Sequence, residues 1–159
     1  MRNLKKILAL VLALVMSLSL MATASAADFT DAGSVNDTYA LAAKVLNGVE
    51  VFRGYEDGSF KPQNNITRAE VAAIVYRIAT GDVKDTQAGI YSTWGKFNDV
   101  LDNQWFAGYV NYCANAGYVK GRDAKTFDPG ANVKGLEATK MVLTALGYDA
   151  TAYKLTGNS

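Results

Sequence analysis

The first turn of one predicted helix holds three side chains of types that bind ligands, Thr67, Arg68 and Glu70. Thr67 and Glu70 stand three residues apart before an apolar run, and this spacing predicts a capping box in which each side chain bonds a backbone amide. Arg68 fits less well, because the helix dipole disfavours a cation there by about 0.3 to 1 kcal/mol. Either the arginine and the helix end receive an anionic ligand, or the arginine is solvated or forms a weak surface ion pair.

Apolar residues at helical spacing predict the elements that carry these side chains. The stripe of the helix that begins near Thr67 consists of Val71, Ile74, Val75 and Ile78, and Gly81 is expected to end that helix. An earlier amphipathic helix, with Asp37 as its expected N-cap, is predicted by Tyr39, Ala42, Ala43 and Leu46. The stretch between the two, GYEDGSFKP, predicts a tight turn at Asp57-Gly58, with Phe60 anchoring the loop.

The same unit occurs twice along the chain. The segment Phe29-Thr30-Asp31 recurs as Phe97-Asn98-Asp99, and the loop GYEDGSFKP recurs as GRDAKTFDP. The first helix of the second copy is predicted by Phe106, Tyr109, Val110 and Cys113, which makes Cys113 a small core residue. The fold class predicted is therefore mostly α, built from two helix-loop-helix repeats.

Composition excludes several kinds of chemistry. The chain has no histidine and one cysteine, so it can form neither a histidine-activated nucleophile, nor a histidine-ligated metal site, nor an intrachain disulfide. Residues 1–26 read as a secretory signal peptide, with basic residues, a short apolar run and Ala24-Ser25-Ala26 in that order. Removing them takes away three of the 16 cations and none of the 15 acids, which leaves a net charge of −2. That balance does not predict a nucleic-acid partner, and no membrane span is expected after cleavage.

The segments FTD, GYEDGSFKP and ITRAE, at these spacings, resemble the S-layer homology repeat of bacterial envelope proteins over nearly all of residues 28–147. The resemblance implies a secreted, non-enzymatic protein of a Gram-positive-type cell wall or S-layer. It implies a helical domain of three repeats in pseudo-threefold arrangement, so two copies form an incomplete one. It also implies non-covalent binding of secondary cell-wall polysaccharide, often carrying pyruvate ketals, in grooves between repeats, and no cofactor.

The resemblance also implies which residues bind the polysaccharide. Arg68 would contact the sugar carboxylate, with Thr67 and Glu70 holding the helix end that presents it. The groove walls would include Asp31 and Asp99, with Trp105 and Tyr39 as aromatic positions. Each has a plainer interpretation as well, because the aspartates could cap turns and Trp105 could belong to the core.

The second copy departs from the motif. Lys134, Gly135 and Leu136 stand where the first copy has Thr67, Arg68 and Ala69, so the capping hydroxyl and the arginine are both absent. Lys134 offers a charge without the planar fork of arginine. This copy is therefore predicted to be mainly structural.

The expected organisation is a signal peptide (1–26), repeat 1 (27–81), a connecting loop (82–96) that Tyr91 and Trp94 pack onto the domain, repeat 2 (97–147) and a tail (148–159). A third repeat is missing, so the chain is expected to be part of a longer protein or to be completed by a homo-oligomer or by other repeats. The main alternative function is a self-assembling or protein-binding surface module without polysaccharide binding. Calcium binding in the acidic loops and a glycosidase pair, Glu70 and Glu137, are less favoured, because the calcium-loop pattern is absent and Glu70 is used in the capping box.

Overall fold

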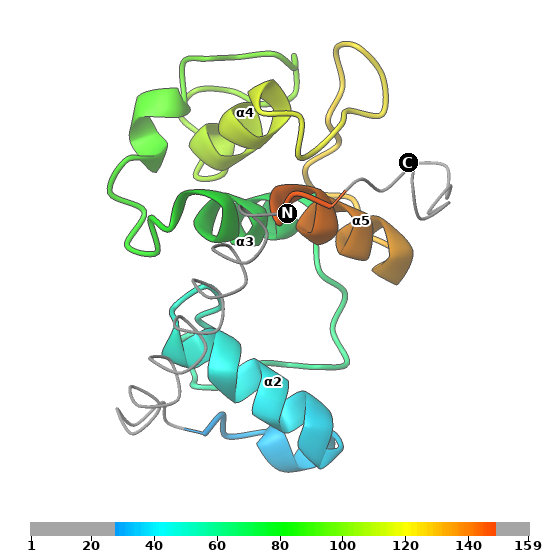
Figure 1. Ribbon diagram of the computed structural model, residues 1–159. Coiled ribbons are helices and arrows are strands. Elements are labelled where there is room, and N and C mark those ends of the chain that lie inside the picture. The colour runs from blue at the N-terminus through cyan, green and yellow to red at the C-terminus, as the bar shows by residue number, and fades with distance from the viewer. Residues whose placement is uncertain (1–27, 149–159) are drawn as a thin grey trace, which may run out of the picture. The chain divides into compact units, whose positions relative to one another are not determined.

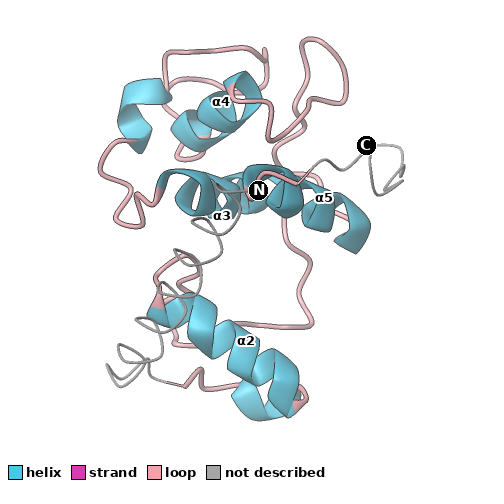
Figure 2. Cartoon of the chain, in the orientation of Figure 1, coloured by secondary structure: helices cyan, strands magenta, loops and turns pink. Residues whose placement is uncertain are grey.

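The computed structural model describes residues 28–148, so the predicted signal peptide and nearly all of the predicted tail lie outside it. Within that range the regular elements are helices and no strand is formed (Figure 2), which confirms the mostly α class. They are η1 (Ala32–Ser34), α2 (Asp37–Gly48), α3 (Arg68–Thr80), η2 (Ala88–Tyr91), α4 (Ala107–Asn115) and α5 (Gly135–Ala145). None of these helices is long and apolar enough to cross a membrane.

The described chain forms two compact units, residues 28–62 and residues 63–148, which we call the first and second units. In the first unit, α2 begins one residue earlier than predicted: Asn36 is the N-cap, and its side chain accepts the amide hydrogen of Tyr39. Asp37 instead occupies the first turn, where its negative charge suits the helix dipole.

Three phenylalanine rings and one carboxylate hold the loop of the first unit. The rings of Phe29, Phe52 and Phe60 lie 5.4 to 5.9 Å apart, so Phe60 anchors the loop as predicted. Asp31 accepts the amide hydrogens of Phe60 and Lys61 at 2.9 and 2.7 Å. Bonds from Phe60 first, and also from Lys61, lower the pKa of Asp31. Asp31 therefore links the start of the repeat to its loop through two hydrogen bonds, an arrangement that we call the aspartate latch.

The second unit is built on α3, which packs against both α4 and α5 (Figure 1). Its buried core combines Val71, Ala72, Val75 and Tyr76 of α3 with residues of the second repeat such as Val110, Cys113 and Met141. Ile74 and Ile78 of the predicted stripe are only partly buried and lie outside this core. The Cys113 thiol lies 3.5 Å from the carbonyl oxygen of Ala72, and burial raises its pKa to about 12. Cys113 is thus the inert core residue that its spacing predicted. The second helix of repeat 1 completes the core of repeat 2.

The connector, residues 82–96, is more ordered than the predicted loop, because it contains η2 and is clamped at several points. The Asp82 carboxylate accepts hydrogens from the Tyr76 hydroxyl, the Thr86 amide and hydroxyl, and the Gln87 amide, at 2.8 to 2.9 Å. Arg77 and Asp85 form a bidentate ion pair with nitrogen–oxygen distances of 2.9 and 2.8 Å. These bonds fix the chain where it leaves α3.

Protonation of Asp82 is predicted to loosen the connector. Hydrogen bonds from the Gln87 amide first, and then from Thr86 and Tyr76, lower the pKa of Asp82 from 3.8 to about 2. Because the folded-state pKa is depressed, the stabilisation is complete above pH 3.8 and is lost as the pH falls through about 2. Urea unfolding of the wild type and of Asp82→Asn should show a difference at neutral pH that vanishes in this window. A difference that is constant with pH would contradict the role given to this carboxylate.

Candidate functional site

The N-terminus of α3, where the sequence motif lies, is closed by partners within the second unit. Thr67 and Glu70 form the predicted capping box, with the Thr67 amide 2.7 Å from the Glu70 carboxylate and the Glu70 amide 3.3 Å from the Thr67 hydroxyl. The next two amides, of Arg68 and Ala69, donate to the carbonyl oxygens of Ala131 and Pro129 at 2.9 and 3.0 Å. The first-turn amides that could receive an anion thus already have acceptors.

The Arg68 side chain is also directed into the second unit, with only 1% of its surface exposed. Its guanidinium lies over the Phe127 ring, 4.5 Å from the centroid. Its three nitrogens donate in turn to the Phe127 carbonyl oxygen at 2.8 Å, to the Lys120 carbonyl oxygen at 2.6 Å and to the Glu137 carboxylate. Burial lowers the pKa of the guanidinium and the Glu137 charge opposes that shift, but an arginine stays charged at neutral pH. Acceptors in repeat 2 therefore balance the cation of repeat 1.

The aspartates at the start of each repeat have one shared role. Asp99 accepts the amide hydrogens of Phe127 and Asp128 at 2.9 and 2.7 Å, as Asp31 does with Phe60 and Lys61 in the first unit. Because Phe127 also supports Arg68, the Asp99 latch positions the carbonyl oxygen and ring on which the guanidinium rests. Asp99 and Arg68 are thus brought into one assembly, whereas Asp31 lies in the first unit.

Trp105 lies outside this assembly and is not a core residue. Its side chain is 62% exposed, and it packs at its edge against Phe106 and Tyr109, with ring centroids 5.5 and 6.2 Å apart. Tyr39, the other predicted aromatic position, is 64% exposed and lies in the first unit. An exposed aromatic ring held at one edge can receive a ligand on its free surface.

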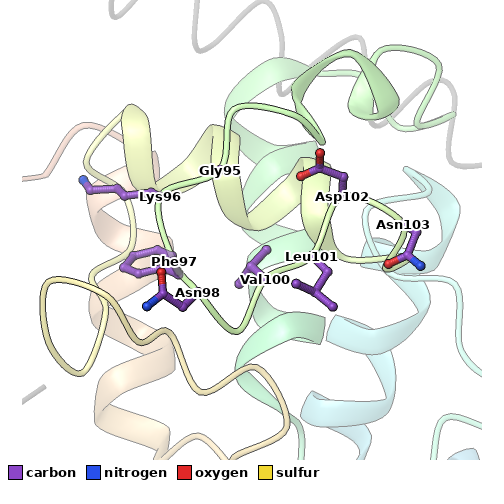
Figure 3. Close-up of a pocket in the computed structure, with 8 residues that line it drawn as sticks. All are labelled: Gly95, Lys96, Phe97, Asn98, Val100, Leu101, Asp102 and Asn103. Carbon is purple, nitrogen blue, oxygen red and sulfur yellow. The ribbon is translucent and has the colours of Figure 1, made fainter.

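An open hollow of about 510 Å³ lies beside Phe97-Asn98-Asp99, the FND segment of repeat 2 (Figure 3). It is lined by residues 95–98 and 100–103, among which Phe97 and Val100 are buried. Polar groups in this lining come from Lys96, Asn98, Asp102 and Asn103. The combination of an apolar base with amide, carboxylate and ammonium groups suits a ligand rich in hydroxyl groups.

Two lysines flank this hollow, and the first repeat has neither. Lys96 lines it, with its ammonium 3.5 Å from the Ala114 carbonyl oxygen, and the backbone of Lys125 lies next to it because the Asn98 amide donates to the Lys125 carbonyl oxygen at 2.7 Å. The matching bond of repeat 1 joins Thr30 to Gly58 at 3.0 Å, so Gly58 stands where repeat 2 has Lys125. Asp28 precedes FTD as Lys96 precedes FND. The exposed cations at this place thus belong to repeat 2.

Comparison with known proteins identifies the family. The model of the S-layer homology domain matches residues 28–72 and 96–139, which together make up more than half of the chain. The chain belongs to the S-layer homology domain family. Its location is accordingly the bacterial cell surface, and membership supports a role in cell-surface anchoring.

Relatives of this S-layer homology chain include surface-layer, cell-wall and anchoring proteins. The chain is 33% identical over 98% of its length to a "Surface layer protein" of Brevibacillus choshinensis, and 32% identical over 98% to a "Middle cell wall protein" of Brevibacillus brevis. It is 32% identical over 67% of its length to a "Cellulosome-anchoring protein" of Acetivibrio thermocellus. It spans 14%, 15% and 23% of these three proteins, whose names describe surface and anchoring proteins and not enzymes. No solved structure gives a significant match.

Sequence reasoning missed three residues of this S-layer homology module: Glu137 as the partner of Arg68, and the lysines at positions 96 and 125. Glu137 was recognisable as the repeat equivalent of Glu70, but its ion pair joins residues 69 positions apart. The lysines carried a usable signal, because aligning the two copies shows that charge is gained at both places. The contact of Arg68, Thr67, Glu70, Asp31, Asp99 or Trp105 with polysaccharide stays a prediction.

Removal of the Arg68 guanidinium is predicted to destabilise the second unit severely. Arg68→Ala should lower the free energy of unfolding by about 3 to 5 kcal/mol, because it leaves the Glu137 carboxylate, itself 11% exposed, without its main partner. Arg68→Lys should cost less but cannot reproduce three bonds in one plane. Urea unfolding of the single variants, of Glu137→Gln and of the double variants measures the coupling. A loss below about 1 kcal/mol for Arg68→Ala would instead indicate a solvated arginine.

Proposed function

We propose that this chain holds protein at the cell wall by binding anionic secondary cell-wall polysaccharide, of the pyruvylated type that the family resemblance implies. The observation that carries the proposal is the open hollow of repeat 2 with Lys96 and Lys125 beside it. The name of the cellulosome-anchoring relative supports an anchoring role for the module.

The chemistry of the hollow suits an acidic sugar. An ammonium group attracts a carboxylate as a point charge, and both lysines are exposed, so a ligand can reach them. The amides of Asn98 and Asn103 can donate to and accept from hydroxyl groups, and the Asp102 carboxylate can accept from them. Buried Phe97 and Val100 give the hollow a fixed base. Binding therefore needs no large rearrangement of the backbone.

The residues of the sequence motif are given a positioning role in this proposal. Arg68 reaches the loop of repeat 2 through the Lys120 and Phe127 carbonyl oxygens, and Asp99 ties the same loop to the FND segment. The Thr67–Glu70 capping box holds the helix end that carries Arg68. Trp105 supplies an exposed ring near the end of the lining segment, where it can stack on a sugar. Asp31 serves the equivalent loop of repeat 1.

Removal of the Lys96 charge is predicted to weaken retention on the wall. Lys96→Gln should raise the dissociation constant for isolated wall material about tenfold, because one charge-assisted hydrogen bond is lost. Lys84→Gln, an exposed lysine of the connector outside the hollow, is the matched control and should bind as the wild type does. Sedimentation with wall material at rising protein concentration gives both constants. Equal binding by the two variants, or no binding by the wild type, would contradict the proposal.

The alternative, a self-assembling surface module, is favoured by a separate observation on α2. Leu46 corresponds to Cys113 of repeat 2, yet Leu46 is 43% exposed whereas Cys113 is fully buried against α3. Other exposed apolar residues of α2 are Tyr39, Leu41 and Val45. Since α3 covers the equivalent face of α4, the face of α2 can receive a helix of another S-layer homology repeat or of a second copy of this chain.

Association through α2 predicts a mass that depends on concentration. Size-exclusion chromatography with light scattering should detect oligomers of the wild type and a monomer for Leu46→Ser, because a hydroxyl replaces an apolar contact at the centre of the face. Ile90→Ser, which alters an exposed apolar residue of the second unit, is the control and should still associate. A wild-type monomer at every concentration would exclude self-assembly.

A further inference from the structure

The segment that lines the hollow of repeat 2 lies, in the sequence, between the two tryptophans of the chain. The lining begins at Gly95, which follows Trp94, and ends at Asn103, two residues before Trp105. Both indole groups are accessible, with 50% of Trp94 and 62% of Trp105 exposed. Figure 3 shows the lining, and each tryptophan is joined to one end of it by two residues of chain or fewer.

Trp94 belongs to the connector, and the backbone that carries it is held on α4 by polar bonds. The Asn111 side-chain amide, fully buried, donates to the carbonyl oxygens of Tyr91 and Ser92 at 3.2 and 2.8 Å. The Trp94 amide in turn donates to the Tyr91 carbonyl oxygen at 3.0 Å. At Gly108 a Cβ atom would lie 1.9 Å from the Ala88 carbonyl oxygen, so glycine is what allows η2 to approach α4 this closely.

The indole itself is oriented by a tyrosine cluster. Tyr91 meets Trp94 at an interplanar angle of 81° with ring centroids 4.8 Å apart. Tyr91 is supported by Tyr112 and Tyr76, at centroid distances of 4.9 and 6.2 Å. Half of the indole therefore stays in water although its backbone and one neighbouring ring are fixed. Such a ring is preorganised, so a ligand that stacks on it need not first order the side chain.

We propose that Trp94 is a stacking subsite for a sugar ring of an acidic polysaccharide, which is bound along the hollow between Trp94 and Trp105. The C–H groups on one side of a pyranose ring carry partial positive charge, and they are attracted by the negative face of an indole. The same sugar units can reach the ammonium of Lys96 and the amides of Asn98 and Asn103. The inference rests on the proposed function. It adds that the protein recognises sugar units within the polysaccharide chain.

The two tryptophans make the test direct, because each can be made the sole indole of the full chain. Trp105→Phe leaves Trp94 as the reporter, and Trp94→Phe leaves Trp105. On titration with polysaccharide purified from the walls of the bacterium that makes the protein, emission from Trp94 should shift to the blue and become less quenched by acrylamide. Unchanged Trp94 emission in a protein that calorimetry shows to be saturated with polysaccharide would overturn the inference.

Affinity provides a second readout with a matched control. Trp94→Ala should weaken binding of the same polysaccharide about five- to tenfold, the usual size of one aromatic contact. Ile90→Ala removes an exposed apolar side chain of the same connector, outside the lining of the hollow, and should bind as the wild type does. Equal affinity of Trp94→Ala and wild type, or an equal loss in both variants, would overturn the inference. If Lys96→Gln still weakens binding in that case, the proposed function stands; failure of the wild type to bind would remove both.

Discussion

A buried arginine that links two repeats is the interaction on which the second unit depends. Its guanidinium is enclosed by a phenylalanine ring, two carbonyl oxygens and the Glu137 carboxylate, so the charge is compensated while almost no surface remains in water. A single charge at that depth would be costly, and a pair is tolerated because every nitrogen has an acceptor. The helix that carries the arginine comes from repeat 1, and its acceptors come from repeat 2. The ion pair therefore defines which parts of the chain fold together.

Local features could be predicted from the sequence because their causes are local. The capping box of Thr67 and Glu70, the left-handed end of α3 at Gly81 and the burial of Cys113 all follow from spacing within one or two turns. The choice of Asp37 as the N-cap of α2 was wrong by one residue, since Asn36 and Asp37 are both good capping residues and only the backbone angles decide between them. Boundaries of this kind depend on where the preceding chain turns.

The position of Arg68 could not be predicted for the opposite reason. A cation in the first turn of α3 is unfavourable on local grounds, and the compensating carboxylate lies 69 residues further along the chain. No spacing rule connects two such residues. The same limit applies to the connector, which has no counterpart in either repeat and whose order comes from Asp82, Asn111 and the close contact at Gly108. Even so, aligning the two copies would have shown that repeat 2 gains positive charge at Lys96 and Lys125.

The boundaries of the sequence repeats differ from those of the compact units, because the second helix of repeat 1 packs with repeat 2. The link between the repeats therefore runs one way, from an arginine in the earlier copy to acceptors in the later one. Repeat 2 supplies a loop and an acid that receive the arginine of repeat 1, as Phe127 and Glu137 receive Arg68. A gene duplication that added such a copy would add one donor and one acceptor, so the array would grow by identical joints from the N-terminal side to the C-terminal side. Gly135, at the place of the arginine in repeat 2, offers no guanidinium for a joint of this kind. A change at this one codon is thus enough to decide whether repeat 2 could be joined to a following repeat through a buried arginine.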